Sequence, residues 1–212
     1  MSAANTFRAL GLLITDNFLS SDECSEFRSN TAQSPAKTAK VVKKGSVEEV
    51  DENRRMVQIA SVPHAMKAAS NLKLVGIKPE LEHHFSLCLD DCEPPQFLAY
   101  GPGHFYVPHF DSSDDEDAPE YMRRRGVSIV IFLNAQSVLP APDCYGGGSL
   151  VFYGLIKEPA FKALGLPLEA TAGMLVAFRS SILHEVKSVT HGNRYTIVTW
   201  FPLAACSSTS LT

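Results

Sequence analysis

Residues 96–111 read QFLAYGPGHFYVPHFD, and this stretch decides the fold expected for the chain. Two short apolar runs, residues 96–100 and 104–110, are separated by a Gly-Pro-Gly turn, a pattern typical of consecutive β-strands. The second run leads into His-Phe-Asp, and residues i and i+2 of a strand point to the same face. His109 and Asp111 are therefore expected to project an imidazole and a carboxylate together.

Further strand-like segments follow this stretch, broken by Gly, Pro and Asp, with no long helix between them. Such a series predicts an antiparallel sandwich or barrel, and the architecture we expect is a double-stranded β-helix, a kind of jelly roll. The additional segments cover residues 127–134, 149–153, 174–178, 182–189 and 194–201.

The helical patterns belong to the first half of the chain. Ser20 can cap a helix through its hydroxyl, and Glu23, three residues later, completes the pattern of a capping box. The other elements expected there are strands at residues 8–15 and 54–62, a polar surface loop at 30–46, and helices at 64–71 and 79–89. The predicted fold class is mainly β with flanking helices (α+β). We expect one domain over residues 1–212, in which residues 1–95 support a β-helix core at residues 96–202.

Two neighbouring side chains on a strand cannot surround a metal ion, so a third ligand must come from elsewhere. His184, in the apolar segment Ile-Leu-His-Glu-Val, is the best candidate. Two imidazoles and one carboxylate form the facial triad of non-haem Fe(II) oxygenases and leave positions open for a 2-oxo acid and dioxygen. His-x-Asp alone is a weak signal, since a hydrogen-bonded pair at a strand end has the same sequence.

Arg194 is the candidate partner for the cosubstrate. We expect its strand to be the antiparallel neighbour of the His184 strand, so that both side chains face inward. The apolar residues around Arg194 predict a buried strand, and a buried guanidinium without a carboxylate would be costly. Its planar fork pairs with the far carboxylate of 2-oxoglutarate, and Thr196, at i+2, adds a hydroxyl donor.

Residues 97–202 resemble the catalytic domain of prolyl 4-hydroxylase-type Fe(II)/2-oxoglutarate-dependent dioxygenases. Five blocks carry the resemblance in the family's order, which is far more specific than any single motif. They are YGPG (100–103) with HFD (109–111), RGVSIVIFLN (125–134), GGSLVF (147–152), GMLVAF (173–178) leading to LHEV (183–186), and GNRYT (192–196).

The resemblance implies hydroxylation of an unactivated C–H bond, with decarboxylation of 2-oxoglutarate to succinate. It implies Fe(II), 2-oxoglutarate and O2, with ascorbate as a candidate addition, and a prolyl residue of a peptide or protein as substrate. The family position of Tyr100 implies a hydrogen bond to the 2-oxoglutarate carboxylate. A free amino acid or other small metabolite is the alternative substrate. A cupin-like metal-binding protein or zinc hydrolase is the alternative of another class, and it would not need Arg194 and Thr196.

The composition and net charge of the chain indicate which classes of binding partner to expect. The chain has 212 residues, a net charge of −4 and a pI of about 6.0, so neither nucleic acid nor a membrane is an expected partner. No signal peptide is apparent. The five cysteines are odd in number and scattered, which predicts reduced thiols and a cytoplasmic location. The sequence does not predict an oligomeric state.

Three further segments carry local expectations. Residues 112–125, acidic and then basic, form a charged loop and a candidate lid over the substrate. Arg54 and Arg55 are adjacent on a predicted strand, so at most one of them should line the entrance. Three consecutive glycines, residues 146–148, predict a tight turn where side chains would not fit.

Overall fold

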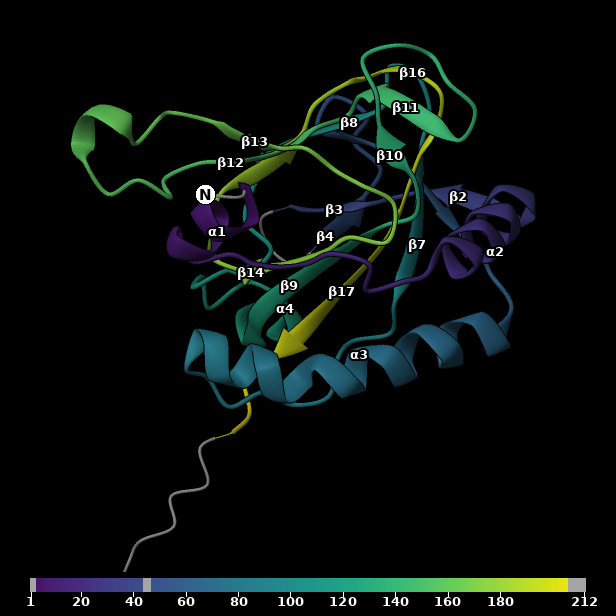
Figure 1. The fold of residues 1–212 in the computed structure, drawn as a ribbon. Coiled ribbons are helices and arrows are strands. Elements are labelled where there is room, and N and C mark those ends of the chain that lie inside the picture. The colour runs from purple at the N-terminus through teal and green to yellow at the C-terminus, as the bar shows by residue number, and fades with distance from the viewer. Residues whose placement is uncertain (1–2, 44–46, 206–212) are drawn as a thin grey trace, which may run out of the picture.

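Two antiparallel β-sheets face each other in the computed structural model, which describes residues 3–43 and 47–205, and helices α2 and α3 flank the larger sheet (Figure 1). This is the double-stranded β-helix with supporting helices that the strand series predicted. In spatial order the seven-stranded sheet contains β1 (Leu13–Thr15), β14 (Leu175–Arg179), β9 (Arg125–Phe132), β17 (Arg194–Pro202), β7 (Gln96–Tyr100), β6 (Gln58–Ala60) and β2 (Ala36–Thr38).

The smaller sheet has five strands and carries much of the functional site. Its order is β13 (Leu166–Leu168), β12 (Leu150–Phe152), β15 (His184–Val186), β8 (Phe105–His109) and β5 (Arg55–Met56). The remaining strands are β10 (Ala135–Gln136), β11 (Cys144–Gly147) and β16 (Val189–His191), which form a three-stranded sheet, and the hairpin β3 (Val41–Lys43) and β4 (Val47–Glu49). The helices are α1 (Ala3–Ala9), α2 (Ser21–Gln33), α3 (His64–Phe85), α4 (Glu120–Arg124) and a 3-10 turn (Pro159–Phe161).

From Val127 to Phe132 strand β9 is apolar apart from Ser128, because both of its faces are buried. Ile129 and Ile131 pack toward the helices, while Val130 and Phe132 pack between the two sheets. The same period of two applies to β17, where Ile197 joins the helix-side core and Arg194 faces the interior between the sheets. Successive side chains of the large sheet therefore point alternately to the helix-side core and to the interior between the sheets, where they can line a site.

Helix α3 is one continuous helix of 22 residues, so the prediction of two helices, at 64–71 and 79–89, was wrong. Its buried positions Met66, Ser70, Leu74, Ile77, Leu81 and Phe85 follow the spacing of one helix face. Pro79 is tolerated inside the helix, because residue 75, whose carbonyl loses its partner, is exposed to solvent. Cys88, inside the predicted second helix, lies beyond the end of α3 and is exposed.

Elsewhere in the first half, the capping box at the start of α2 is confirmed: the Glu23 N–H donates to Ser20 Oγ, and the Glu23 carboxylate accepts from the Ser20 N–H. The strand expected at residues 8–15 is shorter, because α1 occupies its first residues and only β1 pairs, with β14. The polar loop expected at 30–46 contains the end of α2 and strands β2 and β3. Residues 44–46 lie outside the described ranges.

The strands expected after residue 95 are confirmed within one or two residues, except that residues 182–189 divide between β15 and β16. Strands β10, β11 and β13 lie outside the predicted segments. Gly147 has φ 62° and a Cβ there would lie 2.3 Å from the Ser188 carbonyl oxygen, so the expected need for glycine in this turn holds. Within the described ranges, no helix is long and apolar enough to cross a membrane.

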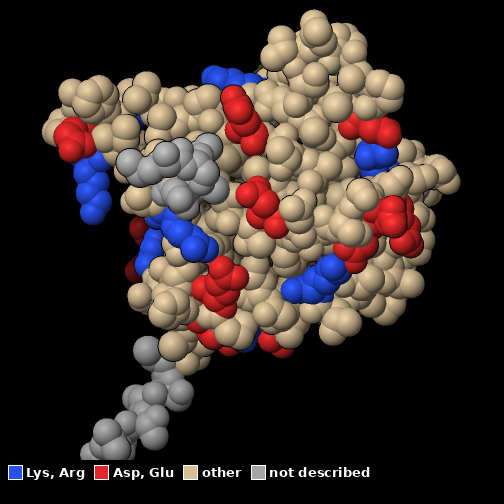
Figure 2. All heavy atoms as spheres, in the orientation of Figure 1, with Lys and Arg blue, Asp and Glu red and all other residues tan. Residues whose placement is uncertain are grey.

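Charges on the molecular surface are of mixed sign. Figure 2 shows Lys and Arg interspersed with Asp and Glu on one face, with no broad area of a single sign. The acidic residues 114–117 are exposed beyond β8, and α4 follows them before β9 begins.

Candidate metal centre

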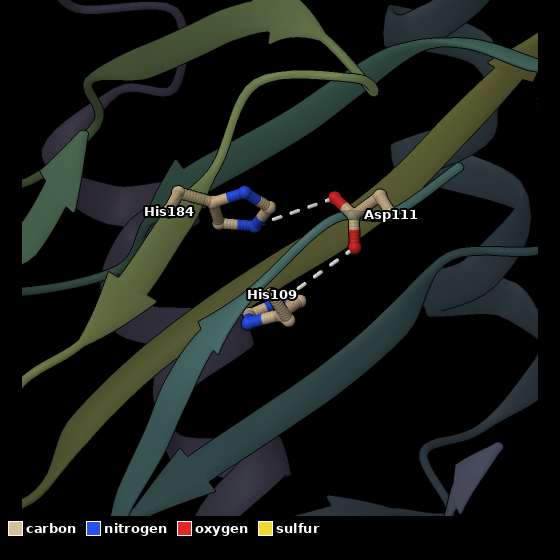
Figure 3. Close-up of side chains that lie close together, drawn as sticks. All are labelled: His109, Asp111 and His184. Carbon is tan, nitrogen blue, oxygen red and sulfur yellow. Dashed lines mark ion pairs between the residues drawn. The ribbon is translucent and has the colours of Figure 1, made fainter. Parts of the chain in front are cut away.

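Strand pairing brings the two predicted histidine ligands together. Strands β8 and β15 are antiparallel neighbours, with His109 directly opposite His184, and their ring centroids lie 4.2 Å apart. Asp111 follows two residues after His109 and turns its carboxylate toward both imidazoles, as Figure 3 shows. Oδ1 lies 3.7 Å from Nε2 of His109, and Oδ2 lies 3.5 Å from Nε2 of His184. One ligand atom from each of the three residues lies within 4.8 Å of the other two.

Backbone carbonyls orient both imidazoles. The Nδ1 atom of His109 lies 2.8 Å from the Val107 oxygen, and that of His184 lies 2.9 Å from the Ile182 oxygen. A carbonyl can only accept, so each Nδ1 carries the proton and each Nε2 presents its lone pair toward Asp111. This is the tautomer that can bind a metal ion through Nε2.

The protonation states also suit a cation. Burial, together with the charge of His184, lowers the pKa of His109 to about 3, against the opposing influence of Asp111. Burial alone would raise the pKa of Asp111, but His184, His109 and the Ser128 hydroxyl outweigh it and lower this pKa to about 2. Near neutral pH the site therefore offers a carboxylate beside a neutral His109, and a metal ion needs deprotonated ligands of this kind.

Arg194 is a buried cation without a carboxylate partner. Its side chain is 1% exposed, and within residues 3–43 and 47–205 no carboxylate oxygen comes within ion-pair distance. The guanidinium lies over the rings of Tyr100 and Phe132, at 5.0 and 5.1 Å, and Nη1 contacts Thr196 Oγ1 at 3.4 Å. Its Nε makes no hydrogen bond. An isolated buried charge of this kind calls for an anion from outside the chain.

Tyr145 joins this group and was missed by the sequence analysis. Its buried hydroxyl makes no hydrogen bond, and its ring lies 6.0 Å from the Arg194 guanidinium. Burial raises the pKa of Tyr145, and the charge of Arg194 opposes the shift. The unused donors of Tyr145 and Arg194, with the Thr196 hydroxyl, fit a carboxylate group. Gly148 has φ 59°, and a Cβ there would lie 2.9 Å from Val189 and 3.1 Å from Cδ of Arg194, which together explain a glycine at this position.

The triad and the buried arginine share one inner cavity of about 40 Å³. Arg194, Thr196 and Tyr100 line it together with all three triad residues. Strand β17 was expected to be the neighbour of the His184 strand, and this was wrong: β17 pairs with β7 and β9 in the large sheet, while β15 lies in the small one. His184 and Arg194 meet because the two sheets face each other across the interior.

A larger outer cavity of about 590 Å³ opens beside the triad. Both Arg54 and Arg55 line it, so the expectation that at most one would do so was wrong. The reason is local: Arg54 lies in the turn before β5, which starts at Arg55, so the alternation of a strand does not apply to the pair. Of the candidate lid, Ser112, Ser113 and several residues near α4 line the cavity, whereas residues 114–117 do not.

Comparison with known proteins agrees with this geometry. Residues 95–202 match the family model described as the 2OG-Fe(II) oxygenase superfamily, which covers just over half of the chain. The chain belongs to this superfamily. The matched residues of this oxygenase run from just before β7 to the end of β17, and so include the whole triad and Arg194.

Curated relatives include proteins named PKHD-type hydroxylases. This oxygenase is 30% identical over 183 residues to one from Klebsiella pneumoniae, and the match covers 86% of this chain and 74% of that protein. It is 38% identical over 104 residues to one from Picosynechococcus, covering 49% of this chain and 39% of that protein. It spans about half the length of several such relatives, for example 54% of one from Psychrobacter.

Solved structures share the fold over nearly the whole chain. The crystal structure of a Pseudomonas putida prolyl-4-hydroxylase aligns with a TM-score of 0.63 and 25% identity, covering 95% of this oxygenase and 97% of that chain. A prolyl hydroxylase from Trichoplax adhaerens, solved with a hypoxia inducible factor peptide fragment, aligns with a TM-score of 0.65 and 21% identity, covering 94% and 86%.

Proposed function

We propose that this chain is an Fe(II)- and 2-oxoglutarate-dependent dioxygenase that hydroxylates a prolyl residue of a peptide or protein. The observation that carries the proposal is the buried Arg194, which has no carboxylate within ion-pair distance among the described residues and lines the same cavity as His109, Asp111 and His184. A zinc hydrolase or a cupin-like metal-binding protein would use the triad but has no need for a buried carboxylate receptor beside it.

The proposed roles follow from the atoms that are free. Nε2 of both histidines and the Asp111 carboxylate hold Fe(II) from one side, which leaves the remaining positions to ligands. Arg194, Thr196 and Tyr145 hold the far carboxylate of 2-oxoglutarate, and the Tyr100 ring lies against the guanidinium. When bound, Fe(II) and 2-oxoglutarate supply dioxygen activation: one oxygen atom enters succinate as CO2 leaves, and the other enters a C–H bond of the substrate. Apolar side chains such as Leu98, Val130 and Leu150 line the inner cavity and restrict water.

The prolyl substrate rests on the relatives. One neighbour of similar fold is a prolyl-4-hydroxylase at 25% identity, and another was solved with a peptide. The outer cavity beside the triad, at about 590 Å³, is within the roughly 300–1,000 Å³ range of ligand sites, so it can receive a short peptide segment.

Two further parts of the proposal concern the whole chain. Residues 1–212 act as one domain, because β1, β2 and β6 from the first 95 residues pair into the sheet that carries Arg194. The protein works in a reducing, cytoplasmic environment, which the free thiols of Cys24, Cys88, Cys92 and Cys144 support. Cys206 lies outside the described ranges.

The test uses purified protein without oxygen. Adding Fe(II) and 2-oxoglutarate should produce a weak visible charge-transfer band, and admitting oxygen should then yield succinate. Asp111→Ala should abolish turnover, and Arg194→Ala should weaken 2-oxoglutarate binding while metal binding remains. Mass spectrometry of proline-containing peptides should show the gain of one oxygen atom. Activity supported by zinc without consumption of 2-oxoglutarate would refute the proposal.

A further inference from the structure

One wall of the outer cavity is basic. Lys37, Lys40, Arg54 and Arg55 line it, and none of the four makes an ion pair within the ranges that the structure describes. Arg125 also lines the cavity, but its charge is used, because Glu93 accepts from its Nε and Nη2 at 2.6 and 2.7 Å. Uncompensated positive charge therefore gathers here in a chain whose net charge is −4.

The carboxylates that line the same cavity do not neutralise this wall. Glu48, which accepts a hydrogen bond from the Tyr121 hydroxyl at 3.1 Å, keeps its negative charge but forms no ion pair with any of the four cations, and Asp111 belongs to the triad. The acidic residues 114–117 are exposed and do not line the cavity. The cations consequently face the space that a substrate would occupy.

Arg55 connects the basic wall to the metal centre. Its guanidinium lies 4.7 Å from the centre of the Tyr106 ring, and that ring stacks on the His109 imidazole at 3.5 Å with an interplanar angle of 16°. Nη1 donates to the Lys40 carbonyl at 3.1 Å, whereas the buried Nε has no hydrogen-bond partner. Arg55 lines the inner cavity as well as the outer one.

The backbone fixes these cations relative to the reacting centre. The Arg54 carbonyl accepts a hydrogen bond from the Val107 N–H at 3.0 Å, and Arg55 pairs with Tyr106 between β5 and β8. Strand β8 also carries His109. An anion bound by these arginines would therefore lie at a set distance along the cavity from the proposed iron site.

We propose that the substrate of this site is an acidic polypeptide segment, with Asp or Glu side chains close to the residue that is hydroxylated. This inference rests on the proposed function and names its substrate class. The positive charge extends from half-buried Arg55 outward to exposed Lys37, Lys40 and Arg54, which suits an extended chain with several carboxylates better than one small anion. Exposed Phe110 and the rings of Tyr121 and Trp200 give apolar contacts to the same chain.

The test compares three pools of peptides that carry the same neutral dye and a central proline. The flanking positions combine Gly and Ala with Asp and Glu, with Asn and Gln, or with Lys and Arg. Fluorescence anisotropy then gives the apparent Kd for the whole protein with Co(II) and 2-oxoglutarate. The acidic pool should bind about five- to tenfold more tightly than the neutral pool, and this preference should shrink when salt is raised to about 1 M.

Two double variants test whether the preference for the acidic pool arises from the basic wall. Lys40→Gln with Arg54→Gln should remove most of the preference for the acidic pool, and both side chains are exposed, so the fold should be unaffected. Lys157→Gln with Lys162→Gln removes the same formal charge from exposed positions that do not line the cavity, and should leave the preference unchanged. Equal loss in both variants would show a general charge effect and overturn the proposal.

Other outcomes separate this inference from the function on which it rests. Succinate formation in oxygen with equal binding of all three pools would refute the acidic substrate and leave the oxygenase proposal intact. Acidic preference without any consumption of 2-oxoglutarate would refute the oxygenase proposal and leave the binding preference. Displacement of the acidic pool by free citrate at a concentration equal to the peptide Kd would show that a small anion is the ligand, and would overturn the polypeptide assignment.

Discussion

The Ser128 hydroxyl donates a hydrogen bond of 2.7 Å to Oδ2 of Asp111. Ser128 is buried on β9, facing the interior, and its Oγ lies 2.9 Å from the Oγ of Ser180. Because the Ser128 proton is directed to the carboxylate, Ser180 is the donor in the second bond. The backbone N–H of Asp111 in turn donates to the Ser180 carbonyl at 3.0 Å. Two serines thus fix the carboxylate that the proposed metal site depends on.

Ser128→Ala should weaken metal binding without unfolding the protein. Removing an outer hydrogen bond to a metal ligand typically costs about 10- to 100-fold in affinity, so we expect a Kd for Fe(II) or Co(II) raised by about tenfold. Ser180→Ala should have a smaller effect, because Ser180 acts through Ser128. Ser70→Ala, a buried serine of α3 whose hydroxyl bonds only within the helix, is the matched control. An unchanged Kd in Ser128→Ala, measured by Co(II) absorption, would contradict this role.

Arg194→Met tests whether the buried cation serves binding and not stability. Methionine is apolar and flexible, and a buried charge without its anion is costly, so the ligand-free variant should unfold at the same or higher denaturant concentration. Binding of 2-oxoglutarate in the presence of Co(II) should weaken by about 100-fold or more, which is about 2.7 kcal/mol. Calorimetric titration and urea unfolding measure the two effects.

The control for this variant is Arg179→Met, at an exposed position of β14 that lines neither cavity. It should leave 2-oxoglutarate binding unchanged. A large loss of ligand-free stability in Arg194→Met would mean that the guanidinium is a structural element and would weaken the cosubstrate assignment.

Tyr145→Phe should separate stability from binding in the same way. The Tyr145 hydroxyl is buried without a hydrogen bond in the ligand-free protein, so its removal should leave the unfolding free energy unchanged or raise it by about 1 kcal/mol. If this hydroxyl contacts the cosubstrate carboxylate, the KM for 2-oxoglutarate should rise by about three- to tenfold at nearly constant kcat. Tyr195→Phe, a half-buried tyrosine on the helix side of β17, is the control. An unchanged KM would exclude Tyr145 from the carboxylate site.

The parts of the site that could be predicted from sequence lie on regular strands. His109 with Asp111, and Arg194 with Thr196, are i, i+2 pairs, and the two-residue period of a strand places each pair on one face whatever the rest of the fold does. His184 could be proposed because an open metal site requires a third ligand. Where these residues meet depends on which strands are neighbours in the sheets. The assumption that the His184 and Arg194 strands pair with each other was wrong, although both side chains do face the interior.

The residues that were not predicted lie where local patterns are weak. Tyr145 is on the short strand β11, in a Gly-rich segment that has no alternation to read, and its partner Arg194 is about fifty residues away in the sequence. Ser128 is one polar residue in an apolar strand. Its role becomes visible only when the fold places β9 beside the triad, where its hydroxyl bonds to Asp111. Pro79 suggested a helix boundary, yet tertiary burial of Leu74 and Ile77 on the same helix face outweighs the lost hydrogen bond.

Loading the site should raise the thermal stability of the protein, since a ligand that binds only the folded state stabilises it by mass action. At about 100 times its Kd, Co(II) contributes about 2.7 kcal/mol, which corresponds to a rise in Tm of about 5–10 °C for a chain of this size. EDTA should reverse the shift. Asp111→Asn keeps the side-chain shape but removes the negative charge, so it should lose most of the shift, whereas Asp16→Asn, at an exposed position that lines neither cavity, should keep it. A shift of equal size in Asp111→Asn would place the metal elsewhere, because the carboxylate between His109 and His184 is the only negative charge in the proposed ligand set.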